Sequence, residues 1–288
     1  MFIAALGTFA ALVFGAADFL GGLAAKRSHP VLVTATVAFT GLVVLVLVLP
    51  FVPGRWSPEA ALWGGLSGVA GALAIALLYA CLAIGPMSIL SPLTAVVSAL
   101  VPLTVGLARG EQLGTLGYVG LGLALVAVVL VGFVPEKGAV RPTPAGVLMA
   151  VGSGAMIGTF LVLIDQAPDD SGLVPLLWNR GVNGLLMLGA TGFLALRYRY
   201  SARTGTARTL TTGGLRLAMF GGVVDAVANS LLLLGVRIGD LSVIGVLTAL
   251  YPAGTILLAA SVLKERIAPV QWTGLAVALA ATGLLAIP

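Results

Sequence analysis

Long runs of apolar residues, separated by short polar stretches, make up most of the chain. An apolar run of about 20 residues is long enough for a helix to cross the hydrocarbon core of a bilayer. The apolar positions are continuous within each run and do not alternate with polar ones, so the pattern favours helices over strands. Ten runs are predicted as membrane spans, with approximate bounds 2–24, 31–52, 60–82, 86–108, 113–134, 144–164, 173–195, 215–235, 240–262 and 269–287.

The second half of the chain repeats the first. Residues 84–130 match residues 238–284 without a gap when they are shifted by 154 positions. The matching pairs include Thr94 and Thr248, Glu111 and Glu265, and Gly120 and Gly274. The first two spans of each half match at a spacing of 143 positions, so the second half carries an insertion of 11 residues, which falls in its polar run.

Each half therefore contains five spans, and an odd number places the second copy upside down relative to the first. The sequence predicts an all-α membrane protein of ten transmembrane helices, arranged as two inverted five-helix repeats. The first repeat is 1–134, the linker is 135–143 and the second repeat is 144–288. Inverted-topology repeats are typical of transporters, in which two copies move about a central site that opens to either side in turn.

The composition indicates a membrane protein. Of the 288 residues, 59% are hydrophobic and 9% are charged, whereas soluble domains carry about 25% charged residues. The net charge of +5 comes from basic residues between the apolar runs, so it is interpreted as a topology signal and not as a nucleic-acid surface. With one Cys and one His, the chain can form no internal disulfide and no His-based metal site, and no cofactor is expected.

The residues around the repeated Glu resemble the signature of a known family. They read Gly110-Glu111-Gln112-Leu113 followed by Gly117 and Gly120, and again Lys264-Glu265-Arg266 followed by Gln271-Trp272 and Gly274. With ten spans and a five-helix repeat, they resemble the EamA-type exporters of the drug/metabolite transporter superfamily, although Lys264 stands where a Gly is usual. The resemblance implies a basket-like fold in a bacterial plasma membrane. It also implies export or exchange of small metabolites such as amino acids, nucleobases or drugs.

Polar side chains within the spans are candidate functional residues, because a charge at the bilayer centre costs at least about 2.5–3.5 kcal/mol. Asp225 lies near the middle of its span, and Asn229 lies one turn further on the same face. Arg180 shares a face of another span with Asn183, at a depth that brings it within reach of Asp225. We predict an Arg180–Asp225 pair that lines a substrate cavity, where Asp225 binds a cationic group or carries a proton. The alternative is a buried pair that only fixes the helix register.

Asp18 is a second candidate for proton coupling. It lies near the loop end of the first span, where it could titrate during transport or extend towards Lys26 and Arg27. Its estimated depth predicts that it does not pair with Arg180.

Further candidates for the cavity are Trp178, Thr94, Thr248, Tyr251 and Tyr79. Pro252 follows Tyr251 and predicts a bend in that span, because it frees a backbone carbonyl. Both Thr residues fit a cavity wall, but a Thr in a membrane helix more often bonds its own backbone. Tyr79 fits an interfacial belt as well as a gate.

Basic residues are concentrated in the odd-numbered loops, so the positive-inside rule predicts that both termini lie outside the cytoplasm. The family resemblance implies the opposite orientation.

The function favoured by these patterns is a secondary transporter that works by alternating access. The chain contains no phosphate-binding Gly-rich motif with its Lys, so no ATPase of its own is expected. The alternatives are a channel-like facilitator, a structural membrane partner and a membrane-embedded enzyme, the last of which usually needs His or acid clusters. The expected partners are a small-molecule substrate and the lipid bilayer, and either a monomer or a homodimer fits.

Overall fold

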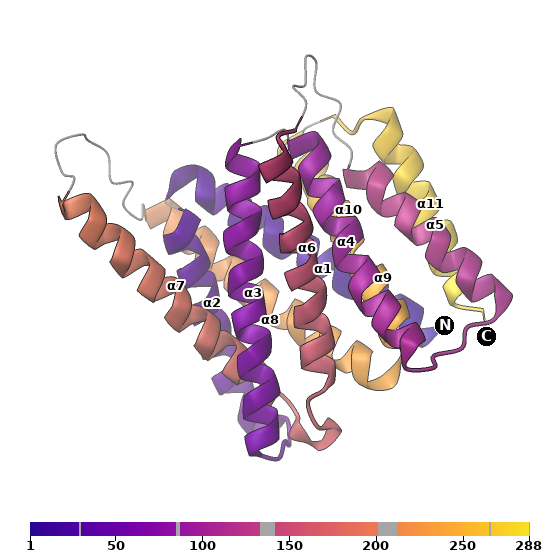
Figure 1. Ribbon diagram of the computed structural model, residues 1–288, viewed down its shortest axis with the longest axis horizontal. Helices are drawn as coiled ribbons and strands as arrows, with labels where there is room; N and C mark the ends of the chain where they lie inside the picture. The colour runs from indigo at the N-terminus through magenta and orange to yellow at the C-terminus, as the bar shows by residue number, and fades with distance from the viewer. Residues whose placement is uncertain (29, 85–86, 133–141, 201–211, 265, 288) are drawn as a thin grey trace.

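The computed structural model describes the whole chain except residues 29, 85–86, 133–141, 201–211, 265 and 288. The described residues form helices and no strand (Figure 1). The helices are α1 (Phe2–Arg27), α2 (Pro30–Val48), α3 (Pro58–Ile84), α4 (Met87–Ala108), α5 (Thr115–Gly132), α6 (Pro144–Asp165), α7 (Val174–Tyr200), α8 (Thr212–Ile238), α9 (Leu241–Thr248), α10 (Tyr251–Val262) and α11 (Pro269–Leu285), with short 3-10 turns at Leu49–Phe51 and Asp169–Ser171. The predicted all-α class is therefore confirmed, and the predicted linker lies largely outside the described residues.

Seven stretches of the described chain are long and apolar enough to cross a membrane. They are Phe2–Ala25, Leu32–Phe51, Pro58–Leu78, Thr115–Gly132, Pro144–Asp165, Thr212–Ile238 and Leu241–Val262. Two shorter apolar helices, Pro92–Ala108 and Pro269–Leu285, accompany them. The fold is therefore a bundle of helices of membrane-spanning length.

Along α3, large side chains face outward and small residues face the neighbouring helix. The exposed large residues are Leu62, Leu66, Val69 and Leu73. On the other side, a methyl group added to Gly64 or Gly68 would overlap the backbone of α7 at Pro175 or Asn179. Lipid tails give apolar helices no reason to associate, so close backbone contact at small residues provides the packing. This arrangement fits a helix whose outer face meets lipid.

Helices of the first half pack mainly against helices of the second half. The principal pairs are α1 with α8 and α10, α2 with α7 and α8, α3 with α6 and α7, α4 with α6 and α9, and α5 with α11. The pattern is unchanged when the halves are exchanged, because the α1–α8 pair corresponds to α6–α3 and the α1–α10 pair to α6–α4. Gly15 and Gly158 make equivalent close approaches in these pairs, Gly15 to the α10 backbone at Gly254 and Gly158 to α4 at Val101.

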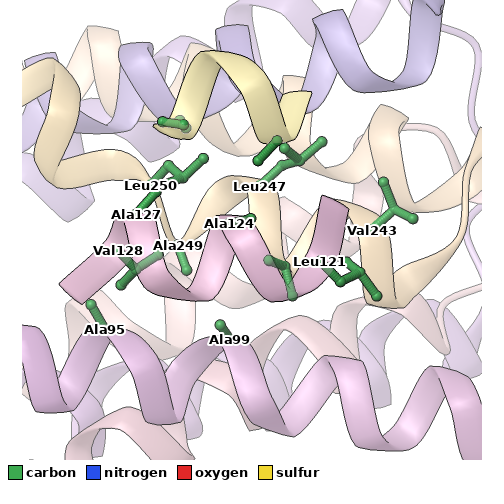
Figure 2. Close-up of a cluster of buried hydrophobic side chains, with 14 of the residues drawn as sticks. Ala95, Ala99, Leu121, Ala124, Ala127, Val128, Val243, Leu247, Ala249 and Leu250 are labelled. Carbon is green, nitrogen blue, oxygen red and sulfur yellow. The ribbon is translucent and has the colours of Figure 1, made fainter. Parts of the chain in front are cut away.

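The largest buried cluster joins α4, α5, α9 and α11, and Figure 2 shows part of it. Small residues such as Ala95 and Ala124 are fully buried there, beside Val128 and Leu247. The predicted ninth span is interrupted in this cluster, since α9 ends at Thr248 and α10 begins at Tyr251. Pro252 at the start of α10 has no N–H to donate, which gives the break predicted for this position its physical cause.

The two ends of the bundle carry different connections. The α6–α7 end, as we call it, carries the α2–α3, α4–α5, α6–α7 and α8–α9 connections, and both chain termini also lie at this end in Figure 1. The α1–α2 end is the opposite one. Helices α5 and α11 lie side by side and run in opposite directions between these ends (Figure 1).

Candidate functional site

A cavity of about 140 Å³ lies among α1, α2, α3, α7 and α8. It is lined by Ala17, Asp18, Gly21, Gly22, Val33, Thr34, Val37, Ala38, Ile75, Arg180, Asn183 and Asp225. The second half of α1 and the first half of α2 supply eight of these twelve residues, so the cavity lies nearer the α1–α2 end. Asp18 and Gly22 are exposed, which marks where it opens to the outside of the bundle.

An ion pair between two helices lies on the cavity wall. Arg180 Nη2 on α7 lies 2.5 Å from Asp225 Oδ2 on α8. Asn229, one turn further along α8, donates from Nδ2 to Asp225 Oδ1 at 3.2 Å and to the Asp225 carbonyl at 2.8 Å. The carboxylate of Asp225 is therefore held on both oxygens, and it fixes the guanidinium of Arg180 against the cavity.

Two buried polar atoms on the same turn of α7 have no hydrogen-bond partner among the described residues. They are Nε of Arg180, which is a donor, and Oδ1 of Asn183, which is an acceptor. The two residues are 9% and 4% exposed, and both line the cavity. Because unpaired buried polar atoms cost about 1–3 kcal/mol each, this pair points to a ligand or water that satisfies them.

Asp18 provides the opposite charge on α1. Within the described part of the chain, its carboxylate has no ion pair, although it lines the same cavity as Arg180. The cavity thus combines the Arg180–Asp225 pair with an acid that has no ion pair among the described residues, and apart from Thr34 and Asn183 the rest of its wall is apolar or small.

Comparison with known proteins identifies the family of the chain. Residues 144–287, half of the chain, match the model of the EamA-like transporter family. The chain belongs to the EamA-like transporter family. This EamA-like chain is part of the drug/metabolite transporter superfamily, and its apolar helices make it a multi-pass membrane protein. The family is one of transporters and not of enzymes.

The fold of this EamA-like transporter is also found in a solved crystal structure. That structure covers 99% of this chain and 98% of its own, with a TM-score of 0.76 and 17% sequence identity. At this identity the likeness shows the fold alone. No curated protein matches the sequence.

The Arg180–Asp225 contact predicted from the sequence is present in the transporter, and Asn229 lies beside it as predicted. The sequence predicted that Asp18 does not pair with Arg180, and no ion pair joins the two among the described residues, although both line one cavity. The depth estimate behind that prediction followed straight, upright helices, whereas α7 lies obliquely in the bundle (Figure 1) and carries a long Arg side chain.

Three other predicted residues do not line the cavity. Trp178 is 43% exposed, because it lies two positions before Arg180 and so on the other side of α7. Thr94 is fully buried and donates to the carbonyls of Leu90 and Ala150, so it bonds the backbone as the alternative interpretation stated. Thr248, at the end of α9, has a buried hydroxyl without a partner among the described residues.

The remaining predicted residues lie elsewhere or outside the description. Tyr251 packs against the core cluster at the start of α10 and is not on the cavity wall. The side chain of Tyr79 and the whole of Glu265 lie outside the described residues. No group of three or more His, Cys, Asp or Glu side chains is placed to hold a metal ion within the described ranges.

Sequence reasoning missed the small and apolar wall of the cavity. Gly21 and Gly22 on α1 have no atom within 4 Å of an added methyl group, so they leave open space beside Asp18. Val37 and Ala38 on α2 form the facing wall. Paired Gly residues directly after a membrane-embedded acid are a signal that could have located this space.

Proposed function

We propose that this EamA-like transporter is a secondary exporter or exchanger of small amino-acid-like solutes, working by alternating access in the cell membrane. The observation that carries the proposal is the cavity lined both by Asp18, an acid without an ion pair among the described residues, and by the Arg180–Asp225 pair. Such intramembrane charges are costly and are kept where they line a solute path.

A zwitterionic solute matches the unsatisfied groups of the cavity. Its carboxylate accepts from the Nε–H of Arg180, a charge-assisted bond of the kind guanidinium groups favour. Its ammonium group donates to Asn183 Oδ1 and to the carboxylate of Asp18. One ligand class thus satisfies a donor, an acceptor and a charge that the described residues leave unpaired.

The size of the cavity narrows this class. Pockets for drug-sized ligands usually measure about 300–1,000 Å³, and this one measures about 140 Å³. The volume favours a solute with a short side chain over a nucleobase or a bulky cation.

Asp18 also provides a route for coupling. A proton and the ammonium group of the solute can each neutralise the Asp18 carboxylate. Competition between a proton and the solute for Asp18 would drive exchange of one for the other.

Alternating access requires two halves that can move about the site. Three observations support ten spans in two inverted five-helix repeats. The helix contacts stay the same when the two halves are exchanged, α5 and α11 run antiparallel, and both termini lie at the same end of the bundle. In this arrangement α4, α7 and α11 complete the set of spans begun by the seven long apolar stretches.

The proposal is tested with purified protein in liposomes, loaded with unlabelled solute and challenged with labelled glycine, alanine, serine, uracil or choline. We expect saturable exchange of the small amino acids. Asp18→Asn should lower it about tenfold or more, because the acid acts directly on the solute. Asp169→Asn, the same change at an exposed turn away from the cavity, should leave it intact.

A second variant separates charge from hydrogen bonding. Arg180→Lys keeps a cation beside Asp225 but removes the Nε–H. It should therefore weaken the binding of solutes that have a carboxylate and leave the binding of other solutes unchanged. Exchange of choline or uracil alone, or equal activity of Asp18→Asn and the parent, would overturn the proposed solute class.

A further inference from the structure

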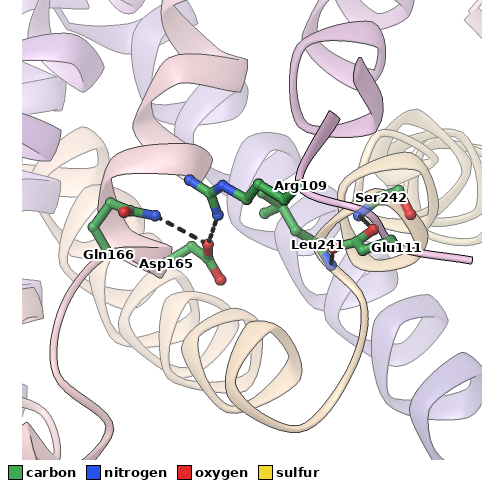
Figure 3. A network of polar contacts seen from close by, with 6 residues as sticks. All are labelled: Arg109, Glu111, Asp165, Gln166, Leu241 and Ser242. Atoms are coloured by element: carbon green, nitrogen blue, oxygen red, sulfur yellow. Dashed lines mark hydrogen bonds and ion pairs between the residues drawn. The ribbon is translucent and has the colours of Figure 1, made fainter. Parts of the chain in front are cut away.

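Two residues just after α4, Arg109 and Glu111, bind two helices of the second half at the α6–α7 end (Figure 3). Arg109 Nη1 lies 2.5 Å from Asp165 Oδ2, at the last residue of α6. Glu111 Oε1 accepts from the N–H of Leu241 at 2.8 Å, and Oε2 accepts from the N–H of Ser242 at 3.1 Å. We call Arg109 and Glu111 the clasp, since together they join α4 to both α6 and α9.

The contact with α9 suits the carboxylate. The first N–H groups of a helix have no acceptor within the helix, and the helix dipole favours a negative charge there. Asp240, the residue before α9, makes no side-chain capping bond. Glu111 therefore supplies from the first half the cap that α9 lacks in its own sequence.

Two glycines shape the clasp. Gly110 has a φ of +92°, a conformation that suits Gly, and it turns the chain so that Glu111 points back towards the bundle. A methyl group on Gly106 would overlap the Glu111 carboxylate, and the Gly106 carbonyl accepts from the Glu111 N–H at 3.2 Å. The Gly-Glu motif thus has a structural role at the end of α4 and does not reach the cavity.

The clasp and the cavity mouth lie at opposite ends of the bundle. The segment after α2 packs at the α6–α7 end, where the N–H of Arg55 donates to the Asp170 carbonyl at 2.8 Å. The start of α2, which carries Val33 and Val37 of the cavity wall, therefore lies at the other end. The clasp ties the two halves together at the end where the cavity does not open.

We propose that the clasp is the closed gate at the α6–α7 end, and that Arg109 and Glu111 must release α6 and α9 before the cavity can open there. This inference rests on the proposed alternating-access function. The eight residues of α9 are separated from α10 by the break after Thr248, so α9 can move as a unit once its hydrogen bonds to Glu111 are broken. Loss of the clasp shifts the resting protein towards the form open at the α6–α7 end.

The test uses one cysteine on the cavity wall. Cys81 is replaced by Ala, and Gly21→Cys, on the cavity wall where an added side chain meets no atom within 4 Å, reports on the cavity in sealed vesicles treated with a small membrane-impermeant thiol reagent on one face at a time. The parent should be labelled from the α1–α2 face. Glu111→Gln should raise the labelling rate from the other face about tenfold, because a neutral amide is a weaker acceptor than a carboxylate for the two N–H groups of α9.

Matched controls separate the gate from general damage. Glu59→Gln makes the same change at an exposed residue in the first turn of α3, and it should leave both labelling rates as in the parent. Arg109→Asp and Asp165→Arg should each raise labelling from the α6–α7 face, and the double swap should restore the parent pattern, which also shows that the variants fold.

The two proposals fail in different ways. A parent labelled equally from both faces would overturn alternating access itself, and the gate with it. A parent labelled from one face, with Glu111→Gln no different from Glu59→Gln and with no rescue by the double swap, would overturn the gate alone.

Discussion

Two regions of the bundle are built from corresponding helices but treat polar groups in opposite ways. Where α3 meets α6 and the start of α7, two buried polar side chains are neutral and paired: Asn179 donates to Ser67 Oγ at 2.9 Å, and Ser153 donates to the Ala74 carbonyl at 2.8 Å. Where α1 and α8 meet α2, the helices that correspond to α6, α3 and α7, the groups are charged, and Arg180, which reaches this region from α7, has an Nε–H without a partner among the described residues, beside an open cavity.

The difference follows the repeat. At the 143-residue spacing Asp18 corresponds to Leu161, and at the 154-residue spacing Asp225 corresponds to Gly71. Leu161 is 5% exposed in an apolar cluster, whereas Asp18 is exposed to the cavity. One region therefore satisfies its polar groups to hold helices together, while the other leaves them available. Satisfied polar contacts indicate scaffold, and unsatisfied ones beside open space indicate a site.

The largest expected effect comes from removing one partner of the charged region. Asp225→Ala leaves the buried Arg180 without its counter-charge and should lower the free energy of unfolding by about 3–5 kcal/mol. Ser67→Ala, in the neutral region, should cost about 1–2 kcal/mol, because it removes a neutral hydrogen bond. Denaturant unfolding of both variants in detergent provides the measurement, and equal losses would remove the distinction between the regions.

The next effect comes from moving the acid to the corresponding position. Leu161→Asp places a carboxylate in the apolar cluster and should cost about 2.5–3.5 kcal/mol, seen as loss of folded protein on size exclusion. Leu161→Met keeps the volume and should cost less than about 1.5 kcal/mol. Normal yield of Leu161→Asp would mean that this region accepts charge as readily as the cavity does.

Glycines give a smaller contrast between close packing and open space. Gly15→Ala would press on the α10 backbone and should cost about 1–3 kcal/mol. Gly21→Ala meets no atom within 4 Å, so it should change stability by less than about 0.5 kcal/mol while filling part of the cavity. Thermal unfolding and solute exchange measured together distinguish the two, and a stability loss for Gly21→Ala as large as that for Gly15→Ala would contradict the description of the cavity.

The smallest effect concerns a charge outside the membrane. Burial raises the pKa of Asp240, and the negative charge of Glu111 raises it further. A raised pKa in the folded state means that ionisation of Asp240 opposes folding. Asp240→Asn should therefore stabilise the protein above that pKa, by less than about 0.5 kcal/mol because the group is largely exposed and screened. The gain should vanish below about pH 3.9, where an ordinary Asp is also protonated, and unfolding midpoints across pH would reveal it.

The sequence predicted the helical class well because the apolar runs are long and continuous. It also predicted the Arg180–Asp225 contact, since two opposite charges at similar depth have few other ways to be stabilised. It did not reveal that Asp18 and Arg180 share a cavity, because depth along an upright helix ignores tilt. The clasp was missed for a different reason: Arg109 and Asp165 lie at helix ends, where charges are usual and carry no signal of pairing.

The packing of first-half helices against second-half helices has a consequence for synthesis of the protein. When the last helix of the first half has left the ribosome, the partners of α1, α3 and α5 have yet to be made, because those partners are α8, α6 and α11. The close-packed glycine faces stay unpaired in the lipid until translation of the second half is complete. A gene cut between α5 and α6 should accordingly yield two fragments that are stable only when they are expressed together.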